Sequence, residues 1–154
     1  MTASAAVRRR QMGDLVRLRE VRMRAAQRAL AEARAATAIA ERARAAADAA
    51  ADAAVDAHAA AREQLADDPG EAERLLALVD QRRFQRSMAI EALTDARDAE
   101  HQCQREEAER RRGMIVAQAR FDILDARFAD LRADLRRVEE ERAAIEAEDI
   151  RRFR

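Results

Sequence analysis

The stretch Asp67-Asp68-Pro69-Gly70-Glu71 decides the fold of this sequence. It contains the single proline and one of three glycines, and it separates two long helical patterns. Because a residue before proline is disfavoured in the α region, we expect the first helix to end near Asp67. The second helix can start at once, with Asp68 as N-cap, Pro69 in the first turn and Glu71 closing a capping box. A linker this short predicts that the two helices fold back as an antiparallel hairpin.

Both sides of this turn carry apolar residues at helical spacing. The pattern predicts a first helix over about residues 5–66, a turn at 67–71 and a second helix over about 70–152. At 1.5 Å per residue the first helix would be roughly 90 Å long, which is the length of a coiled coil. We therefore predict an all-α fold, a long antiparallel two-helix coiled-coil hairpin that forms one domain over residues 1–154. The stripe predicted on the first helix is Leu15, Leu18, Arg22, Ala25, Ala29, Ala33, Ala36, Ala40, Ala43, Ala47, Ala50, Ala54, Ala57, Ala61 and Leu65.

The second helix has bulky apolar residues at both ends and a polar middle at residues 97–112. From Met114 to Ile145 the apolar spacing alternates between three and four, which is a heptad seam. Near the turn, the bulky set is Leu75, Leu78, Val79, Phe84, Met88, Ile90 and Leu93.

Folding about Pro69 pairs residues whose numbers sum to about 138. The alanine-rich residues 45–63 then lie opposite the bulky residues 75–93, and Leu15, Val16, Leu18, Val21 and Met23 lie opposite the segment from Ala117 to Leu124. We expect two packed ends joined by a weak middle, with residues 138–154 projecting beyond the first helix.

Composition narrows the class of protein. Of the 154 residues, 49% are hydrophobic, but 41 are alanine and only 28 are Leu, Ile, Val or Phe, with no Trp or Tyr. Low content of large apolar residues is typical of disorder, yet 30 basic and 30 acidic residues cancel, and alanine, arginine and glutamate are strong helix formers. Long helices are therefore favoured over both disorder and a thick globular core.

Several features indicate a cytoplasmic protein. A single cysteine, Cys103, excludes an intramolecular disulfide and fits a reducing compartment. No apolar run approaches the length of about 18 residues that a membrane span needs. The triplet Arg8-Arg9-Arg10 is not followed by the apolar region of a secretory signal. We therefore expect no stable membrane insertion.

Catalytic chemistry is not indicated. His58 and His101 lie on different predicted helices and far out of register, and Cys103 is two positions from His101, so their side chains do not face each other. No glycine-rich phosphate loop, metal-ligand cluster or nucleophile triad is present. We predict no enzyme activity, no catalytic residue, no metal and no cofactor.

Charge is uneven along the first helix. Residues 8–34 contain nine arginines and three acids, whereas residues 41–68 contain three arginines and seven acids. One interpretation is a solvated helix face with i,i+4 ion pairs. The other is that the basic end meets an acidic or polar partner surface. Nucleic acid is disfavoured, because no aromatic platform is interleaved with the arginines.

The pattern Leu15-x-x-Leu18-Arg19-x-x-Arg22, followed by a ladder of Ala25/Ala26, Ala29-Leu30 and Ala33, resembles the FliJ/YscO family. These are small cytoplasmic stalk proteins of flagellar and virulence-type type III secretion export machines, and the likeness covers the whole chain in length and layout. The resemblance implies a non-enzymatic coiled coil that inserts into the hexameric export ATPase, activates it and links it to the export gate protein. It also places the protein in the cytoplasm, peripheral to a membrane-embedded export apparatus. The partner-binding residues that it implies are Leu15, Leu18, Arg19, Arg22, Phe121, Phe128 and Leu131.

Two other functions compete with this hypothesis. The chain could be a generic coiled-coil scaffold that holds partners or self-associates. It could also be a chaperone for exported subunits that uses an apolar seam at residues 114–145. A stable dimer without an effect on ATP turnover would favour the scaffold, and a one-to-one complex with an export substrate would favour the chaperone.

A helix-breaking substitution tests the length of the first helix. Ala47→Pro should remove much of the helical circular dichroism signal, because proline in a helix interior costs about 3 kcal/mol. Unchanged ellipticity would argue against a long first helix.

Overall fold

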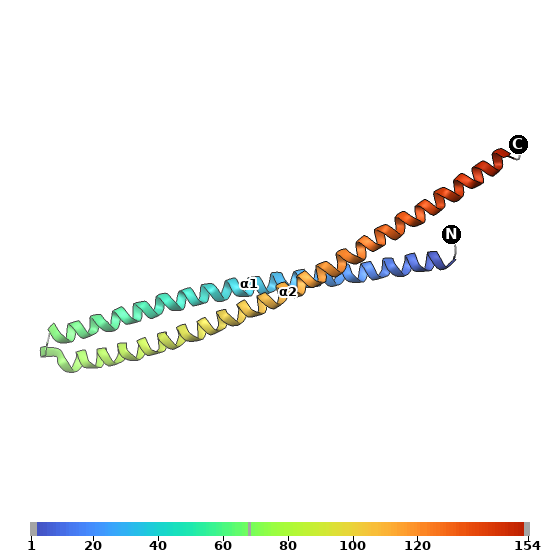
Figure 1. Cartoon of the computed structure of the whole chain (residues 1–154). Helices are drawn as coiled ribbons and strands as arrows, with labels where there is room; N and C mark the ends of the chain where they lie inside the picture. The colour runs from blue at the N-terminus through green and yellow to red at the C-terminus, as the bar shows by residue number, and fades with distance from the viewer. Residues whose placement is uncertain (1–2, 68, 153–154) are drawn as a thin grey trace. The chain divides into compact units, whose positions relative to one another are not determined.

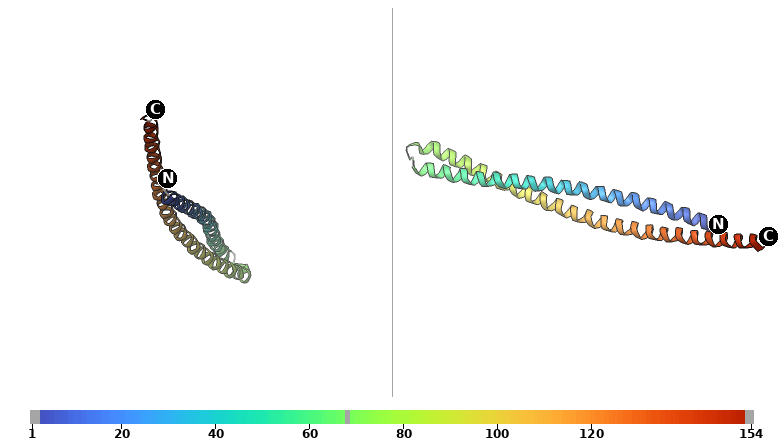
Figure 2. Two further views of the ribbon diagram at one scale, coloured as in Figure 1. Left: turned by 90° about the vertical axis from the view of Figure 1, so that its right-hand side faces the viewer. Right: turned by 90° about the horizontal axis from the view of Figure 1, so that it is seen from above.

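The computed structural model describes residues 3–67 and 69–152, and all of them are helical. Helix α1 spans Ala3–Asp67 and helix α2 spans Ala72–Arg152, with a short 3-10 helix, η1, at Pro69–Glu71 between them. The two long helices run in opposite directions and pack against each other (Figures 1 and 2). The predicted class, an all-α antiparallel two-helix coiled-coil hairpin, is confirmed.

The turn lies at the position predicted from Pro69. Helix α1 ends at Asp67, and η1 precedes α2. The Glu71 carboxylate accepts a hydrogen bond from Nε of Arg74 at 2.6 Å. The two residues are three apart in the sequence, so they lie one helical turn from each other. The N-cap role predicted for Asp68, and with it the capping box, falls outside the described residues. No described residue in the turn or elsewhere has a positive φ angle, so the reversal does not depend on a left-handed glycine.

The side of α1 that packs on α2 follows an unbroken heptad pattern. From Met12 to Leu65 the spacing alternates strictly between four and three residues, and every member is buried or half-buried. Such alternation lets two helices supercoil with knobs-into-holes packing. The seam residues of α1 are Met12, Val16, Arg19, Met23, Ala26, Leu30, Ala33, Thr37, Ala40, Arg44, Ala47, Ala51, Ala54, His58, Ala61 and Leu65.

Helix α2 repeats the same alternation from Leu75 to Leu135. Within this seam Arg86 and Arg110 are exposed, and the others are buried or half-buried. The predicted heptad from Met114 onwards is therefore correct as far as Leu135. The seam residues of α2 are Leu75, Val79, Arg82, Arg86, Ala89, Leu93, Ala96, Glu100, Cys103, Glu107, Arg110, Met114, Ala117, Phe121, Leu124, Phe128, Leu131 and Leu135.

The stripe predicted for α1 misses the seam from Leu15 to Ala29 and coincides with it only at Ala33, Ala40, Ala47, Ala54, Ala61 and Leu65. Ala50 is exposed, whereas its neighbour Ala51 is only 5% exposed. Ala36 is likewise exposed, and Thr37 is buried beside it. The Thr37 hydroxyl donates to the carbonyl oxygen of Ala33 at 3.1 Å, so its burial leaves no unpaired donor. A search for apolar residues alone could not find this seam, because it includes polar residues and is surrounded by alanine.

The helix pair consists of two compact units. We call Ala31–Glu109 the hairpin unit, and Met1–Leu30 together with Arg110–Arg154 the terminal unit. On α2 the division lies between Glu109 and Arg110, inside the polar segment 97–112 that was predicted to be a weak point. Helix α2 nevertheless continues through that segment without interruption. The prediction of one domain over residues 1–154 stays a prediction.

The hairpin unit combines small and large core residues with ion pairs between its helices. Its buried apolar residues are Ala51, Ala61, Leu75 and Leu93, which agrees with alanine from α1 facing leucine from α2. Among the bulky residues expected to pack here, Phe84, Met88 and Ile90 are exposed instead. They lie outside the seven-residue alternation of α2.

Among the described residues of the hairpin unit, ion pairs between α1 and α2 define the register. Arg44 Nε lies 3.1 Å from Glu100 Oε2, Arg97 Nη2 lies 3.2 Å from Asp48 Oδ1, and Arg34 Nε lies 3.7 Å from Glu107 Oε1. The paired numbers sum to 141 to 145, a few residues beyond the expected 138. These charges occupy the segment that offers little apolar surface, so they supply pairing where hydrophobic burial is weak.

Two adjacent leucines test the position of the seam. Leu75 is 4% exposed and Leu76 is 52% exposed. We expect Leu75→Ala to lower the free energy of unfolding by about 2 kcal/mol or more, because it leaves a cavity, and Leu76→Ala to change it by less than about 0.5 kcal/mol. Urea denaturation followed by circular dichroism measures both values. Equal losses for the two variants would contradict this seam.

Candidate partner-binding surface

The core of the terminal unit is built around Phe128. This residue is half-buried on the seam of α2. A Cβ atom placed on Gly13 would lie 3.5 Å from Cζ of Phe128, an ordinary van der Waals contact, so the ring lies over Gly13 of α1. The guanidinium carbon of Arg132 lies 4.6 Å from the ring centre, within range of a cation–π contact. Phe128 is therefore enclosed by both helices and by the Arg132 side chain.

The residues predicted to bind partners fall into two groups. Arg19, Phe121, Phe128 and Leu131 are half-buried seam residues. Arg22 is exposed, and Leu15 and Leu18 are 47% and 45% exposed.

The prediction that the apolar residues between Leu15 and Met23 all pack against α2 was therefore partly wrong. Val16 and Met23 are half-buried as expected, whereas Leu15, Leu18 and Val21 point away from the seam. The unbroken alternation of α1 places Val16 and Arg19 on the inner side, so neither leucine can pack there as well.

These two leucines lie on one flank of the helix pair, and α2 contributes apolar residues to the same flank. Leu15 and Leu131 line a surface groove of about 460 Å³. Along the same flank, Arg22 and Val116 line a second groove of about 400 Å³. Leu18 lies one turn from both Leu15 and Arg22, which places it between the grooves. Leu15, Leu18, Val116 and Ile123 form what we call the apolar flank.

Arginines border the apolar flank. The second groove is also lined by Arg19, Arg112 and Arg120, whereas the first has Arg8 and Arg127 together with Asp130 and Asp134. The sequence of the terminal unit contains 20 arginines and 12 acids, a net charge of +8, whereas the hairpin unit contains 10 arginines and 18 acids, a net charge of −8. The apolar flank therefore belongs to a strongly basic part of the chain, which favours an acidic partner.

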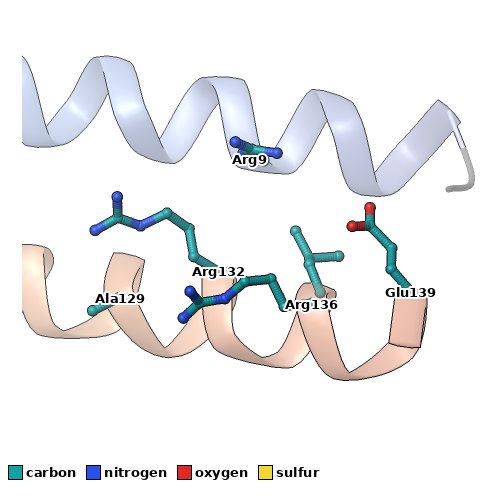
Figure 3. A pocket seen from close by; sticks show the side chains of 6 residues that line it. Arg9, Ala129, Arg132, Arg136 and Glu139 are labelled. Atoms are coloured by element: carbon teal, nitrogen blue, oxygen red, sulfur yellow. The ribbon is translucent and has the colours of Figure 1, made fainter. Parts of the chain in front are cut away.

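A cluster of arginines occupies another groove of the terminal unit. Arg9 from α1 lies across from Arg132 and Arg136 of α2, with Glu139 one turn further along (Figure 3). The groove has a volume of about 410 Å³. No ion pair joins any of the three arginines to another described residue. Guanidinium groups bind carboxylates with paired hydrogen bonds, so the groove that holds the arginine cluster also fits an acidic surface.

Sequence reasoning missed Val116, Ile123 and the arginine cluster. Val116 and Ile123 are exposed, and both lie off the α2 seam. Assigning the seam positions of α2 first would have shown that Val116 and Ile123 are apolar residues outside the seam. The meeting of Arg9 with Arg132 required the register between the helices, which the fold-back sum gave only to within a few residues.

The described residues contain no group of three or more His, Cys, Asp or Glu side chains that could hold a metal ion. In the same part of the chain, no helix is long and apolar enough to cross a membrane. Cys103 is a half-buried seam residue.

No protein-family model matches this sequence, and comparisons with curated proteins and with solved structures gave no match.

Two nearby aspartate substitutions should separate binding from folding in the terminal unit. We expect Leu18→Asp to lower the free energy of unfolding by less than about 1 kcal/mol, since Leu18 is half exposed and the cost is mainly one of helix propensity. Val16→Asp should cost about 2 kcal/mol or more, because it places a carboxylate in the seam. Thermal denaturation of both variants measures the difference. If Leu18→Asp unfolded the protein as readily as Val16→Asp, Leu18 would belong to the seam.

Proposed function

We propose that the protein is a non-enzymatic coiled-coil stalk of a bacterial type III secretion or flagellar export apparatus. In this proposal its terminal unit inserts into the hexameric export ATPase and activates it, and the hairpin links the ATPase to the export gate. The observation that carries the proposal is the apolar flank, where Leu15 and Leu18 are exposed among arginines although they lie within the sequence pattern that resembles the FliJ/YscO family.

A stalk of this kind needs a surface that binds without unfolding the hairpin. The seam of the terminal unit is occupied by packing between α1 and α2, so it is not the surface offered to a ring of subunits. The apolar flank and the arginine cluster are separate from the seam, and both remain available when the helices are paired. An acidic lining of the ATPase opening would complement their charge.

The charge distribution also supports a defined orientation. A net charge of +8 in the terminal unit and −8 in the hairpin unit means that only the terminal unit would be attracted to an acidic opening. Insertion in the reverse direction would bring like charges together, which disfavours the wrong orientation.

Titration of the protein into the export ATPase of the same organism tests this function. At dilute enzyme, ATP turnover should rise and saturate near one chain per hexamer. Leu18→Asp should abolish the rise, because it places a carboxylate among acidic partner groups, while Leu76→Asp, at an exposed leucine of the hairpin unit, should keep it. Both variants should first be shown to be helical.

A flat response with folded wild-type protein would reject the stalk function. Equal loss of activation in Leu18→Asp and Leu76→Asp would reject the assignment of the contact to the terminal unit.

A further inference from the structure

A line of charged residues runs along the apolar flank of α2 at intervals of seven. It consists of Arg120, Arg127, Asp134, Glu141 and Glu148, and all five side chains are exposed. Residues seven apart lie on the same side of a helix in a coiled coil. The line is therefore basic in its first part and acidic in its last part.

Glu141 and Glu148, the last two residues of this line, belong to a helical segment whose described residues are all exposed. Beyond Leu135 every described residue of α2 is exposed, including Val138, Ile145 and Ile150. Val138 lies three residues beyond Leu135 and Ile145 seven beyond Val138, so both continue the spacing of the seam. Residues 138–152 contain six acids and three arginines. The segment is thus an acidic amphipathic helix whose apolar side is uncovered.

The basic apolar flank and the acidic segment have complementary charge, and they lie on the same helix. When a second copy of the chain lies antiparallel to the first, the acidic segment of each copy meets the basic apolar flank of the other copy. Pairing residues whose numbers sum to 268 sets Arg127 against Glu141 and Arg120 against Glu148 of the other copy. The same alignment sets Ile123 against Ile145. Because a two-fold interface uses the same surface on both copies, each of these contacts occurs twice.

We propose that the protein forms a two-fold symmetric dimer in which residues 138–152 of each copy bind the apolar flank of the other. In this alignment Ile123 receives Ile145 of the second copy, and Leu18, which is exposed on the same flank, borders that contact. Leu15 and Leu131, which line one groove, receive Val138. The dimer covers Leu15, Leu18 and Ile123 of the flank and Val138 and Ile145 of the acidic segment at the same time.

The centre of the interface carries one unfavourable contact. Asp134 lies on the two-fold axis and meets Asp134 of the second copy. Its Oδ1 atom lies 3.7 Å from Nη1 of Arg137 on the same helix, which offsets the repulsion. Arg127 and Glu141 form no ion pair with another described residue, so their pairing across the interface breaks no existing pair. Glu148 already pairs with Arg152, whose Nη2 lies 3.1 Å from its Oε1, so Arg120 of the second copy competes for that carboxylate. Since these contacts are exposed, added salt should weaken the dimer.

Charge reversal with rescue tests this interface on the full chain, without any partner protein. Sedimentation equilibrium should show a dimer for the wild type. Arg127→Glu and Glu141→Arg should each raise the dimer dissociation constant by about tenfold or more, because each places like charges together twice. The double variant Arg127→Glu/Glu141→Arg should restore the wild-type constant, since the exchanged charges again meet across the axis.

Matched controls lie on the neighbouring faces of the same helix. Arg136→Glu and Glu140→Arg reverse exposed charges that the dimer does not use, so both should leave the constant within about twofold of the wild type. Circular dichroism establishes that every variant is helical. A monomeric wild type, a dimer insensitive to Arg127→Glu, or failure of the double variant to recover would each overturn the proposal. The dimer does not rest on the export function, and its test contains no ATPase, so the two proposals can fail separately. Because the dimer covers Leu15 and Leu18, it excludes the ATPase contact proposed for the same surface, and the chain must dissociate before that contact forms.

Discussion

The structure depends on one constraint: the inner side chains of both helices alternate between spacings of three and four without interruption. The alternation runs from Met12 to Leu65 on α1 and from Leu75 to Leu135 on α2. Because many seam residues are alanine, each contact buries little area and contributes less than a buried leucine would. The hairpin is therefore held by a long series of small contacts, with Leu30, Leu75 and Leu93 as its most buried large residues.

The sequence predicts the elements of this fold better than their register. Pro69 located the turn to within a residue, and strong helix formers specified both long helices. The inner face of α1 was harder to predict because alanine occurs on every side of the helix, so Ala50 and Ala51 are indistinguishable by type. Polar seam residues such as Thr37 and Arg44 obscured it further. On α2, where Phe121, Leu124 and Phe128 stand out from their neighbours, the predicted seam was correct.

The error in the predicted inner face of α1 bears on the assignment of the partner-binding surface. Once the seam passes through Val16, Leu15 and Leu18 become a second apolar stripe that the hairpin does not use. Apolar residues in such a position cost solubility, so they are expected where another molecule binds. In the hairpin unit, charges pair across the helices, as with Arg44 and Glu100. In the terminal unit, Arg9, Arg132 and Arg136 gather in one groove instead, which leaves positive charge for recognition.

The seam of α1 passes through Ala51 and not through Ala50. Thiol labelling checks this position, with a single cysteine introduced at either residue in a Cys103→Ser background. The cysteine of Ala50→Cys should react with a maleimide at nearly the rate of an unfolded control, and that of Ala51→Cys should react much more slowly. Equal rates, or protection of position 50 alone, would contradict the seam and with it the assignment of Leu15 and Leu18 to an outer surface.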